Sequence, residues 1–404
     1  MSSHVNENMF YFSKAGFVVP TITGLISCLS SLGTMWFILK SKSNTTYHRI
    51  IFTLSFFDMI TSLAIAMTTI PMPKDVIYPF AGSSFGTVGT CEAQGLIYTA
   101  GSGMVLFMNG ILNIYYVCSL RYGMKEEVFG KLIEPVLYLL ALTINGVIPP
   151  IILLKTDLIN PTITDPFCRP GVYPIGCNNS NDPECRGGAE DNRNFTICYL
   201  VAMIAGMVTL ISSMCMIIHS FHKRETNIKK RFLRSRDENR YADSYYGELE
   251  SAKKMKRTLA KQAMMYVGAF LITWLFPFIS FIEGAETTSN WVQALRMVFQ
   301  PLQGFFNLLI FFYHKVSTVQ KTDARRSFFD TLKIVLATPS SVPEVLAISS
   351  IQFVYAHEYL NKKPQENFMS YNIGDEENFE AEESTSVICK EDLVSSTSIS
   401  IQPS

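Results

Sequence analysis

Polar side chains interrupt segments of the sequence that are otherwise apolar enough for a lipid bilayer. The stretch PLQGFFNLLIFFYHK at 301–315 contains a helix breaker, Pro301, together with Gln303, Gly304 and Asn307. Another stretch, LSFFDMITSL, places Asp58 near the middle of an apolar run. Amides in such places exchange hydrogen bonds between helices, and a carboxylate at the centre of a membrane helix costs about 2.5 kcal/mol or more. We therefore expect Asp58 to be compensated by a cation such as sodium or by an amide of Asn109, Asn113 or Asn307, with a protonated carboxyl that is simply hydrogen-bonded as the alternative.

The sequence lacks the residue patterns that carry out reactions. It has no glycine-rich phosphate loop after a strand, no His-Glu-x-x-His pattern and no His and Cys cluster at metal-ligand spacing. The last apolar segment, WVQALRMVFQPLQGFFNLLIFFY, contains no lysine that could hold retinal. We therefore expect a protein that is not an enzyme and that needs no cofactor.

Apolar stretches recur along the chain at the length of a lipid-spanning helix, which is about 20 residues for a bilayer core of about 30 Å. Among 404 residues, 48% are hydrophobic, and 34 basic residues balance 34 acidic ones, so net charge indicates no class of partner. A soluble helix would show a polar face, which LIEPVLYLLALTINGVIPPIILL lacks. We predict an all-α membrane protein with a seven-transmembrane helix bundle, its spans at about 17–39, 50–70, 93–118, 132–154, 196–219, 263–282 and 291–313.

The distribution of basic residues predicts how the spans are oriented, because cytoplasmic loops are enriched in Lys and Arg. Basic residues follow spans one, three and five, at Lys40, Lys42, Arg49, Arg121, Lys125, Lys131, Lys229, Lys230, Arg231, Lys253, Lys254 and Lys256. The start, MSSHVNENMF, lacks the basic and apolar regions of a signal peptide. The expected protein is a multi-pass plasma-membrane protein with its N-terminus outside and its C-terminal tail inside.

Cysteines and glycan acceptors support the same orientation. Cys91 opens span three, and Cys168, Cys177 and Cys185 lie between spans four and five, where the predicted location is oxidising. Four cysteines allow three pairings; we favour Cys91 with Cys168, which leaves Cys177 with Cys185. The same loop carries acceptor sequences at Asn178 and Asn194, whereas the match at Asn44 would lie in the cytoplasm.

The remaining segments divide the chain into four parts. Residues 1–16 form a short outer segment and 17–313 the bundle, in which loop 155–195 reads as an irregular lid. The stretch RDENRYADSYYGELE reads as polar and mobile, and ELESAKKMKRTLAKQAMMYV as a basic extension of span six. Residues 314–336 fit an amphipathic juxtamembrane helix, with a polar linker as the alternative, and 337–404 have the composition of a disordered cytoplasmic tail.

These features together resemble the G-protein-coupled receptors over about residues 15–336. CEAQG at 91–95 and LQGFFN at 302–307 are similar to the Gln-Gly pattern of the cyclic-AMP receptor-like and secretin-like groups. LRYGMKEE at 120–127 resembles the Asp-Arg-Tyr element of the rhodopsin-like group, with Leu in place of the acid. WLFP at 274–277 is similar to the Trp-x-Pro kink with one extra residue, and NLLIF keeps the Asn of Asn-Pro-x-x-Tyr.

The resemblance implies roles for three sets of residues. An intramembrane switch would comprise Asp58, Asn109, Asn113, Trp274, Pro277, Gln303, Gly304 and Asn307. Contacts with a heterotrimeric G protein would come from Arg121, Tyr122, Lys253, Lys254, Lys256, Arg257 and Lys261, although the lysines and arginines could equally be membrane anchors. An outer ligand site would use Tyr98, Tyr199, Trp291, Gln293 and Arg296, which do not distinguish nucleotides, amines, amino acids and lipids.

The sequence therefore predicts a receptor that passes an extracellular ligand signal to a cytoplasmic G protein. Transporters and channels also use broken helices and polar groups at the midplane, so a seven-span transporter or channel is the alternative. An orphan scaffold that binds partners through its tail is a third possibility. The absence of a repeat of three or six spans, and the basic segment before span six, favour the receptor.

Overall fold

The computed structural model describes residues 13–41, 44–76, 82, 84–162, 165–174, 185–235, 242–283, 289–322 and 327–337. The chain divides into two compact units, Met1–His357 and Glu358–Ser404, and every described residue belongs to the first. The expected tail at 337–404 lies outside the described residues, apart from Ala337.

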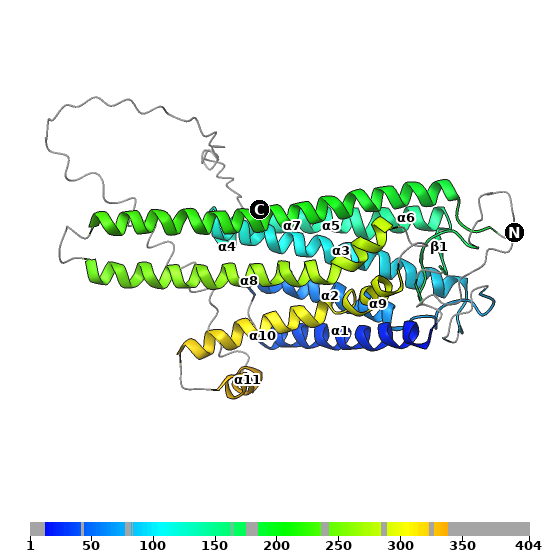
Figure 1. The fold of residues 1–404 in the computed structure, drawn as a ribbon, viewed down its shortest axis with the longest axis horizontal. Helices are drawn as coiled ribbons and strands as arrows, with labels where there is room; N and C mark the ends of the chain where they lie inside the picture. Colours follow the sequence, from blue (N-terminus) through cyan, green and yellow to red (C-terminus); the bar gives the residue numbers. More distant parts are fainter. Residues whose placement is uncertain are drawn as a thin grey trace, which may run out of the picture. The chain divides into compact units, whose positions relative to one another are not determined.

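Seven helices in the described part of the chain are long and apolar enough to cross a membrane, as the sequence predicts. The first three are α1 (Lys14–Ser41), α2 (Thr46–Ala66) and α3 (Val88–Leu120). The fourth span combines α4 (Glu126–Val128), η2 (Phe129–Ile133), α5 (Glu134–Ala141), η3 (Leu142–Val147) and α6 (Ile148–Lys155). It is followed by α7 (Ala189–Ser235), α8 (Ala242–Glu283), α9 (Asn290–Phe299), α10 (Gln303–Thr322) and α11 (Phe328–Ala337) (Figure 1).

Helices α2 and α3 begin where hydroxyl side chains satisfy free backbone N–H groups. Thr45 Oγ1 accepts from the N–H of His48 at 3.3 Å. At α3 the capping is reciprocal, because Thr87 Oγ1 accepts from Thr90 N and Thr90 Oγ1 accepts from Thr87 N. The caps fix where each span begins, and therefore which residues lie at its centre.

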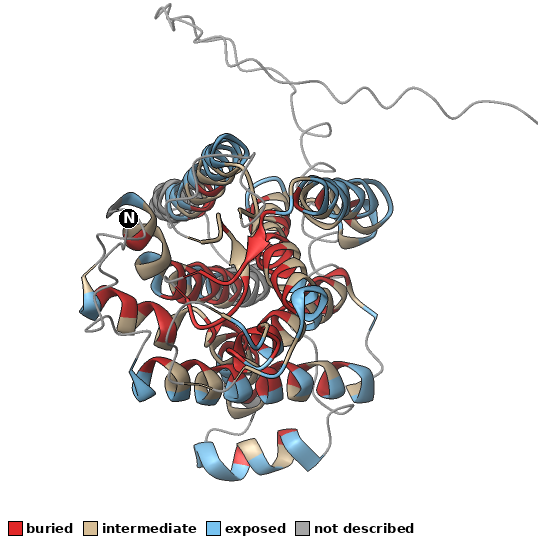
Figure 2. Cartoon of the chain, turned by 90° about the vertical axis from the view of Figure 1, so that its right-hand side faces the viewer, coloured by how far each residue is buried: buried red, intermediate tan, exposed pale blue. Residues whose placement is uncertain are grey.

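Helix α3 lies in the middle of the bundle, whereas the fourth span lies at its edge. The most apolar window of α3 is 61% buried and that of the fourth span 11% buried, and Figure 2 shows buried residues turned toward the centre. Small residues allow this close packing: a Cβ on Gly101 would lie 2.2 Å from Thr61 Oγ1, and one on Gly103 2.5 Å from Asn145 Oδ1. At Gly110, by contrast, nothing lies within 4 Å of such a Cβ, so this glycine is not required for packing.

The fourth span is irregular because prolines interrupt its hydrogen bonds. The π-helical turns η2 and η3 precede Pro135 and the pair Pro149–Pro150. Proline has no N–H and its ring clashes with the carbonyl four residues earlier, so the turn before it widens.

Helices α7 and α8 are much longer than a bilayer requires, with 47 and 42 residues. At 1.5 Å per residue, α7 is about 70 Å long. The expected basic extension of span six is present, and the two helices lie side by side (Figure 1). The stretch expected to be mobile is helical from Ala242 onward, while 236–241 lie outside the described residues.

The juxtamembrane segment differs from the single helix expected at 314–336. Helix α10 continues to Thr322 and a separate helix, α11, begins at Phe328. Within α11, Thr331 and Val335 are buried, whereas Phe328 and Phe329 are exposed. The amphipathic character is confirmed, but the helix is shorter than expected.

One end of the bundle is closed by the segment between the fourth and fifth spans. This segment contains the antiparallel strands β1 (Ile159–Asn160) and β2 (Arg169–Pro170), and a disulfide joins Cys91 to Cys168 as expected. Cys185 is also disulfide-bonded, while Cys177 and Asn178 lie outside the described residues. We call this the disulfide end, and the opposite end, which carries Arg121, Arg257 and Lys261, the basic end.

The amide of Gln94 holds three segments together at the disulfide end. Its Nε2 donates to the carbonyls of Ala64 at 2.9 Å and Thr68 at 2.8 Å, and its Oε1 accepts from the N–H of Cys168 at 3.0 Å. The next residue, Gly95, lets the hairpin approach, since a Cβ there would lie 2.3 Å from Ile159 Cγ2. The residues of CEAQG therefore fasten α3, the end of α2 and the hairpin to one another.

We predict that Gly95→Ala destabilises the protein, whereas Gly110→Ala in the same helix does not. A methyl group at Gly95 would collide with Ile159 and lie 3.2 Å from the Cys168 carbonyl, at a cost of about 1–3 kcal/mol. At Gly110 the space is open, and replacing glycine in a helix gains about 0.5–1 kcal/mol. Thermal unfolding of the purified full chain measures both, and equal melting temperatures for the two variants would contradict the packing described.

Candidate functional site: a polar network around a broken span

The seventh span is broken between α9 and α10, at the proline that the sequence singles out. Helix α9 ends at Phe299 and α10 begins at Gln303. Pro301 has no N–H, so the carbonyl of Met297 loses the helical partner that it would otherwise have. Thr23 Oγ1 of α1 lies 3.2 Å from that carbonyl and 2.9 Å from the carbonyl of Val19 in its own helix, so its single hydroxyl hydrogen is shared between the two. A hydroxyl from a neighbouring span thus replaces part of the hydrogen bond that proline removes.

Two further hydroxyls support the same break. Ser62 Oγ of α2 donates to the carbonyl of Pro301 at 3.4 Å, and the N–H of Gly304 donates to Ser27 Oγ of α1 at 3.1 Å. Gly304 is required here, because a Cβ at that position would lie 2.1 Å from Ser31 Oγ and 2.8 Å from Ser27 Oγ. Helix α10 therefore begins in direct contact with α1.

Gln303 connects the break to α8. Its Oε1 accepts a short hydrogen bond from Thr273 Oγ1, whose single hydroxyl hydrogen is shared with the carbonyl of Phe270 at 2.9 Å. Gln303 and Thr273 are both buried. The broken span is consequently held by side chains or backbone groups of α1, α2 and α8.

One turn further along α10, Asn307 compensates the buried carboxylate. Its Nδ2 donates to Asp58 Oδ2 at 2.7 Å, and Asp58 and Asn307 are 3% and 1% exposed. The other two candidate amides do not reach Asp58: Asn109 donates to the carbonyl of Val105, and Asn113 to that of Asn109, within α3. Of the amides considered, Asn307 is the one that bonds to Asp58.

Trp274 and Pro277 lie on α8 between this network and the disulfide end. The Trp274 ring is buried and stacks on Phe270 with centroids 5.6 Å apart. Pro277 lies inside the helix, where proline removes a hydrogen bond and permits a bend. The switch residues expected on α8 therefore adjoin Thr273, which bonds to Gln303 of span seven.

A buried ionic cluster lies at the disulfide end. Asp165, which is fully buried, pairs with Arg296 of α9 and with Arg169 of the hairpin. Arg296 also donates to Ser280 Oγ of α8 at 3.1 Å. The segment that closes this end therefore inserts a charged side chain among the spans and connects to α8 and α9.

The expected ligand residues separate into interior and exposed positions. Tyr98 accepts from Gln300 Nε2 at 2.8 Å and lies with its ring centroid 4.8 Å from that of Phe167, and Gln293 is 1% exposed. Tyr199 stacks on Phe195 at 6.2 Å. Trp291 is 60% exposed, because it lies on the outward face of α9, away from the interior positions of Tyr98 and Gln293.

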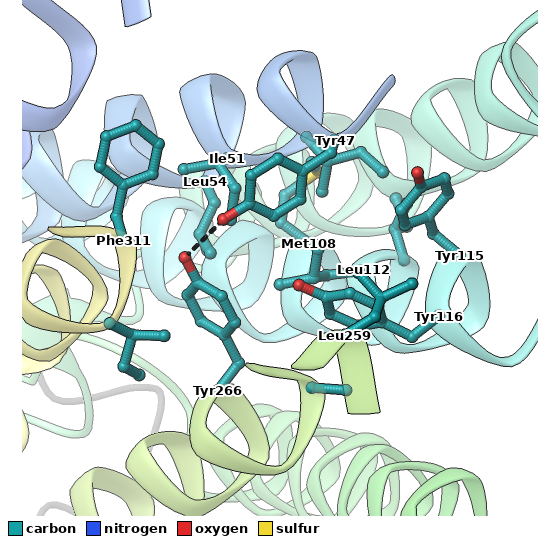
Figure 3. Close-up of a cluster of buried hydrophobic side chains, with 14 of the residues drawn as sticks. Tyr47, Ile51, Leu54, Met108, Leu112, Tyr115, Tyr116, Leu259, Tyr266 and Phe311 are labelled. Carbon is teal, nitrogen blue, oxygen red and sulfur yellow. Dashed lines mark hydrogen bonds between the residues drawn. The ribbon is translucent and has the colours of Figure 1, made fainter. Parts of the chain in front are cut away.

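Sequence reasoning missed a tyrosine cluster at the basic end. Tyr47 of α2 meets Tyr266 of α8 with 3.0 Å between hydroxyl oxygens, and Gln262 Nε2 donates to Tyr47 at 2.6 Å (Figure 3). Lys261 donates to Tyr313 of α10 at 2.8 Å. Gln262 and Tyr266 lie one turn apart on span six, but their partner Tyr47 lies on span two, so no local pattern indicates the contact. No group of three or more His, Cys, Asp or Glu residues in the described ranges could hold a metal ion.

Comparison with known proteins identifies the architecture. Residues 250–318, from α8 into α10, match the family model described as the C-terminal part of a G protein-coupled glucose receptor regulating Gpa2. The fold is similar to the crystal structure of squid rhodopsin, with a TM-score of 0.54, 13% sequence identity, and coverage of 85% of this chain and 91% of that chain. The chain is a G-protein-coupled-receptor-like seven-helix protein. The search of curated proteins found no significant match.

The fold, and the sequence over residues 250–318, are similar to those of G-protein-coupled receptors. The matched segment includes Gln303 and Asn307, so it contains the span-seven part of the polar network. At the basic end of the bundle, Arg121 caps α3 and lies 5.7 Å from the ring of Tyr122, which is 67% exposed. Arg257 is exposed, and the side chains of Lys253, Lys254 and Lys256 lie outside the described part of α8.

We predict that Ser27→Ala destabilises the receptor more than Ser30→Ala, although both remove one buried hydroxyl from α1. Ser27→Ala leaves the N–H of Gly304 without its acceptor, at a cost of about 1–2 kcal/mol. Ser30 Oγ instead donates to the carbonyl of Ile26 in its own helix, so its loss costs less than about 0.5 kcal/mol. Thermal unfolding checks the order, and the reverse order would contradict the role of α1 in supporting the break.

Proposed function

We propose that the protein is a plasma-membrane receptor that binds a small ligand at the disulfide end and activates a heterotrimeric G protein at the basic end. The main support is the family match over spans six and seven, since that family is described by its coupling to Gpa2. The second support is the fold, which brings spans one, two and six into contact with the break in span seven.

The proposed orientation has the disulfide end outside the cell. The Cys91–Cys168 bond favours an oxidising compartment for that end. Asn194, an expected glycan acceptor, is exposed near the start of α7, in a helix rather than in the loop that the sequence indicated. The basic residues at the other end fit the cytoplasmic side. This orientation places the N-terminus outside.

The proposed ligand is a small polyhydroxyl molecule, with D-glucose as the first candidate because the matching family model is described by that sugar. The interior of the disulfide end contains the groups that bind hydroxyls: a carboxylate at Asp165, a guanidinium at Arg296 and amides at Gln293 and Gln300. Phe167 and Tyr98 supply aromatic surface beside them. Such a ligand would exchange hydrogen bonds with Arg296, and α9 and α8 would respond.

The proposed switch is the break in span seven. Its bonds to α1, α2 and α8 are single hydrogen bonds that can be exchanged, and a second arrangement has groups to use: Gln303 Nε2 and Asn307 Oδ1 have no hydrogen-bond partner among the described residues. A ligand that favours one of two arrangements shifts the population toward it. A change in the hydrogen bonds of Arg296 would thereby alter those of Asn307 and Asp58.

The experiment that tests the coupling uses the full chain in lipid vesicles with a purified Gpa2-type heterotrimer. Guanine-nucleotide exchange is measured with and without D-glucose, and with D-mannitol as the matched control. We expect exchange above the rate of vesicles without the chain, and a further increase with D-glucose. If the chain does not increase nucleotide exchange at all, G-protein coupling is rejected. If the chain increases exchange but neither D-glucose nor D-mannitol changes the rate, the proposed ligand alone is rejected.

In the same assay we predict that Arg121→Lys loses most of the coupling. The guanidinium offers five donors in a fixed fork that can cap the carbonyls of an inserted helix, which an ammonium cannot reproduce. Losing two such charge-assisted bonds corresponds to a fall of about tenfold or more. Arg193→Lys, at an exposed position near the start of α7 at the disulfide end, is the control and should couple normally. Normal coupling by both Arg121→Lys and Arg121→Ala, at matched amounts of protein in the vesicles, would assign Arg121 to membrane anchoring.

Asp58→Asn tests the switch, because it keeps the side-chain shape and removes the charge. Asn307 can still donate to the new amide oxygen, so we expect the receptor to fold while its basal and evoked exchange change by about threefold or more. The assay is repeated with sodium and with potassium to test a cation at this carboxylate. Unchanged exchange in both salts would make Asp58 a packing residue.

A further inference from the structure

The basic end contains a hydrogen-bonded contact between α2 and α8 that the proposed switch does not include. Tyr47 of α2 accepts from Gln262 Nε2 at 2.6 Å, and its hydroxyl lies 3.0 Å from that of Tyr266. Tyr47, Gln262 and Tyr266 are at most 4% exposed. These bonds hold α8 against α2 at the basic end, so α8 cannot move away from α2 there without breaking them.

Two polar atoms beside this contact are buried without a partner. The hydroxyl of Tyr116 on α3 and Oε1 of Gln262 on α8 make no hydrogen bond with any described residue, and both side chains are 0% exposed. Tyr116 packs in the same cluster as Tyr47 and Tyr266, with its hydroxyl turned toward the side where those two meet (Figure 3). A phenol can donate and an amide oxygen accepts, so the two unpaired atoms are complementary.

From this geometry we infer that Tyr116 and Gln262 form a hydrogen bond in a second arrangement of the bundle. When α8 moves away from α2, Gln262 leaves Tyr47 and the hydroxyl of Tyr116 donates to Gln262 Oε1. Tyr47 is then the residue that favours the arrangement seen here, and Tyr116 is a positioning residue for the other one. The inference rests on the proposed function, in which that other arrangement activates the G protein.

The balance of hydrogen bonds is consistent with a two-state element. The arrangement seen here has two bonds at Tyr47 and two buried atoms without partners. The second arrangement gives up the two bonds at Tyr47 and gains one bond between the two unpaired atoms, so it is the less stable of the two by about one hydrogen bond. A ligand that favours the second arrangement can offset a difference of that size and shift the population toward it.

Two single-hydroxyl substitutions should act in opposite directions, measured without any ligand by nucleotide exchange in the vesicle assay. Tyr47→Phe removes bonds of the arrangement seen here, so basal exchange should rise about three- to tenfold. Tyr116→Phe removes the donor of the second arrangement. Added to Tyr47→Phe, it should lower the raised basal exchange about threefold or more. Tyr115→Phe, the neighbouring phenol of the cluster, is the control and should leave exchange unchanged.

Hydrogen–deuterium exchange of the purified full chain gives a second readout that needs no G protein. Tyr47→Phe should speed backbone exchange of α8 over residues 257–266, and Tyr116→Phe should reverse that effect in the double variant. If the wild-type chain activates no G protein but this pattern is seen, the proposed function is rejected. The proposed change of hydrogen-bond partners between Tyr47, Tyr116 and Gln262 is then retained. The inference is overturned if Tyr47→Phe and Tyr116→Phe change the basal nucleotide exchange in the same direction. It is also overturned if Tyr115→Phe changes that exchange as much as Tyr116→Phe does, or if Tyr116→Phe lowers the melting temperature.

Discussion

A lipid interior offers no water, so each backbone N–H and C=O that leaves a helix must find a partner inside the protein. Pro301 creates this demand in span seven, and the surrounding spans meet it with Thr23, Ser27 and Ser62. The packing follows from these contacts. Span one must lie against span seven, the residue at the contact must be glycine, and span two must be close enough to reach the Pro301 carbonyl.

The two ends of the bundle are held together by different kinds of interaction. At the disulfide end, a covalent bond, an amide with three hydrogen bonds and the ion pairs of Asp165 hold the hairpin in place. At the basic end, α2 and α8 are joined by phenols and an amide, with Tyr47 and Gln262 at their centre, while an ion pair of Arg49 with Glu134 joins α2 to the fourth span. Single neutral hydrogen bonds are easier to exchange than a disulfide, so motion is expected between α2 and α8 at the basic end and a fixed frame at the disulfide end.

Much of the fold follows from sequence because its strongest signals are local. Apolar length predicts the spans, and a proline between amides predicts the break in span seven. The partner of Asp58 could be narrowed to three amides but not chosen, because Asn109 and Asn113 look equally suitable until the helices are placed and α3 is found to satisfy them itself. The exposure of Trp291 and the open space beside Gly110 likewise depend on helix rotation, which apolar length does not determine. The tyrosine cluster joins residues more than 200 positions apart, and no local pattern announces it.

The length of α8 makes it a lever. From Pro277 to Ala242 the helix covers 35 residues, or about 52 Å at 1.5 Å per residue. A tilt of about 5° at the proline would move the far tip by about 4–5 Å, while Thr273, one turn from the proline, would move by about 0.5 Å. A hydrogen-bond rearrangement too small to disturb the core could therefore displace the distal end of α8 by more than the diameter of a water molecule.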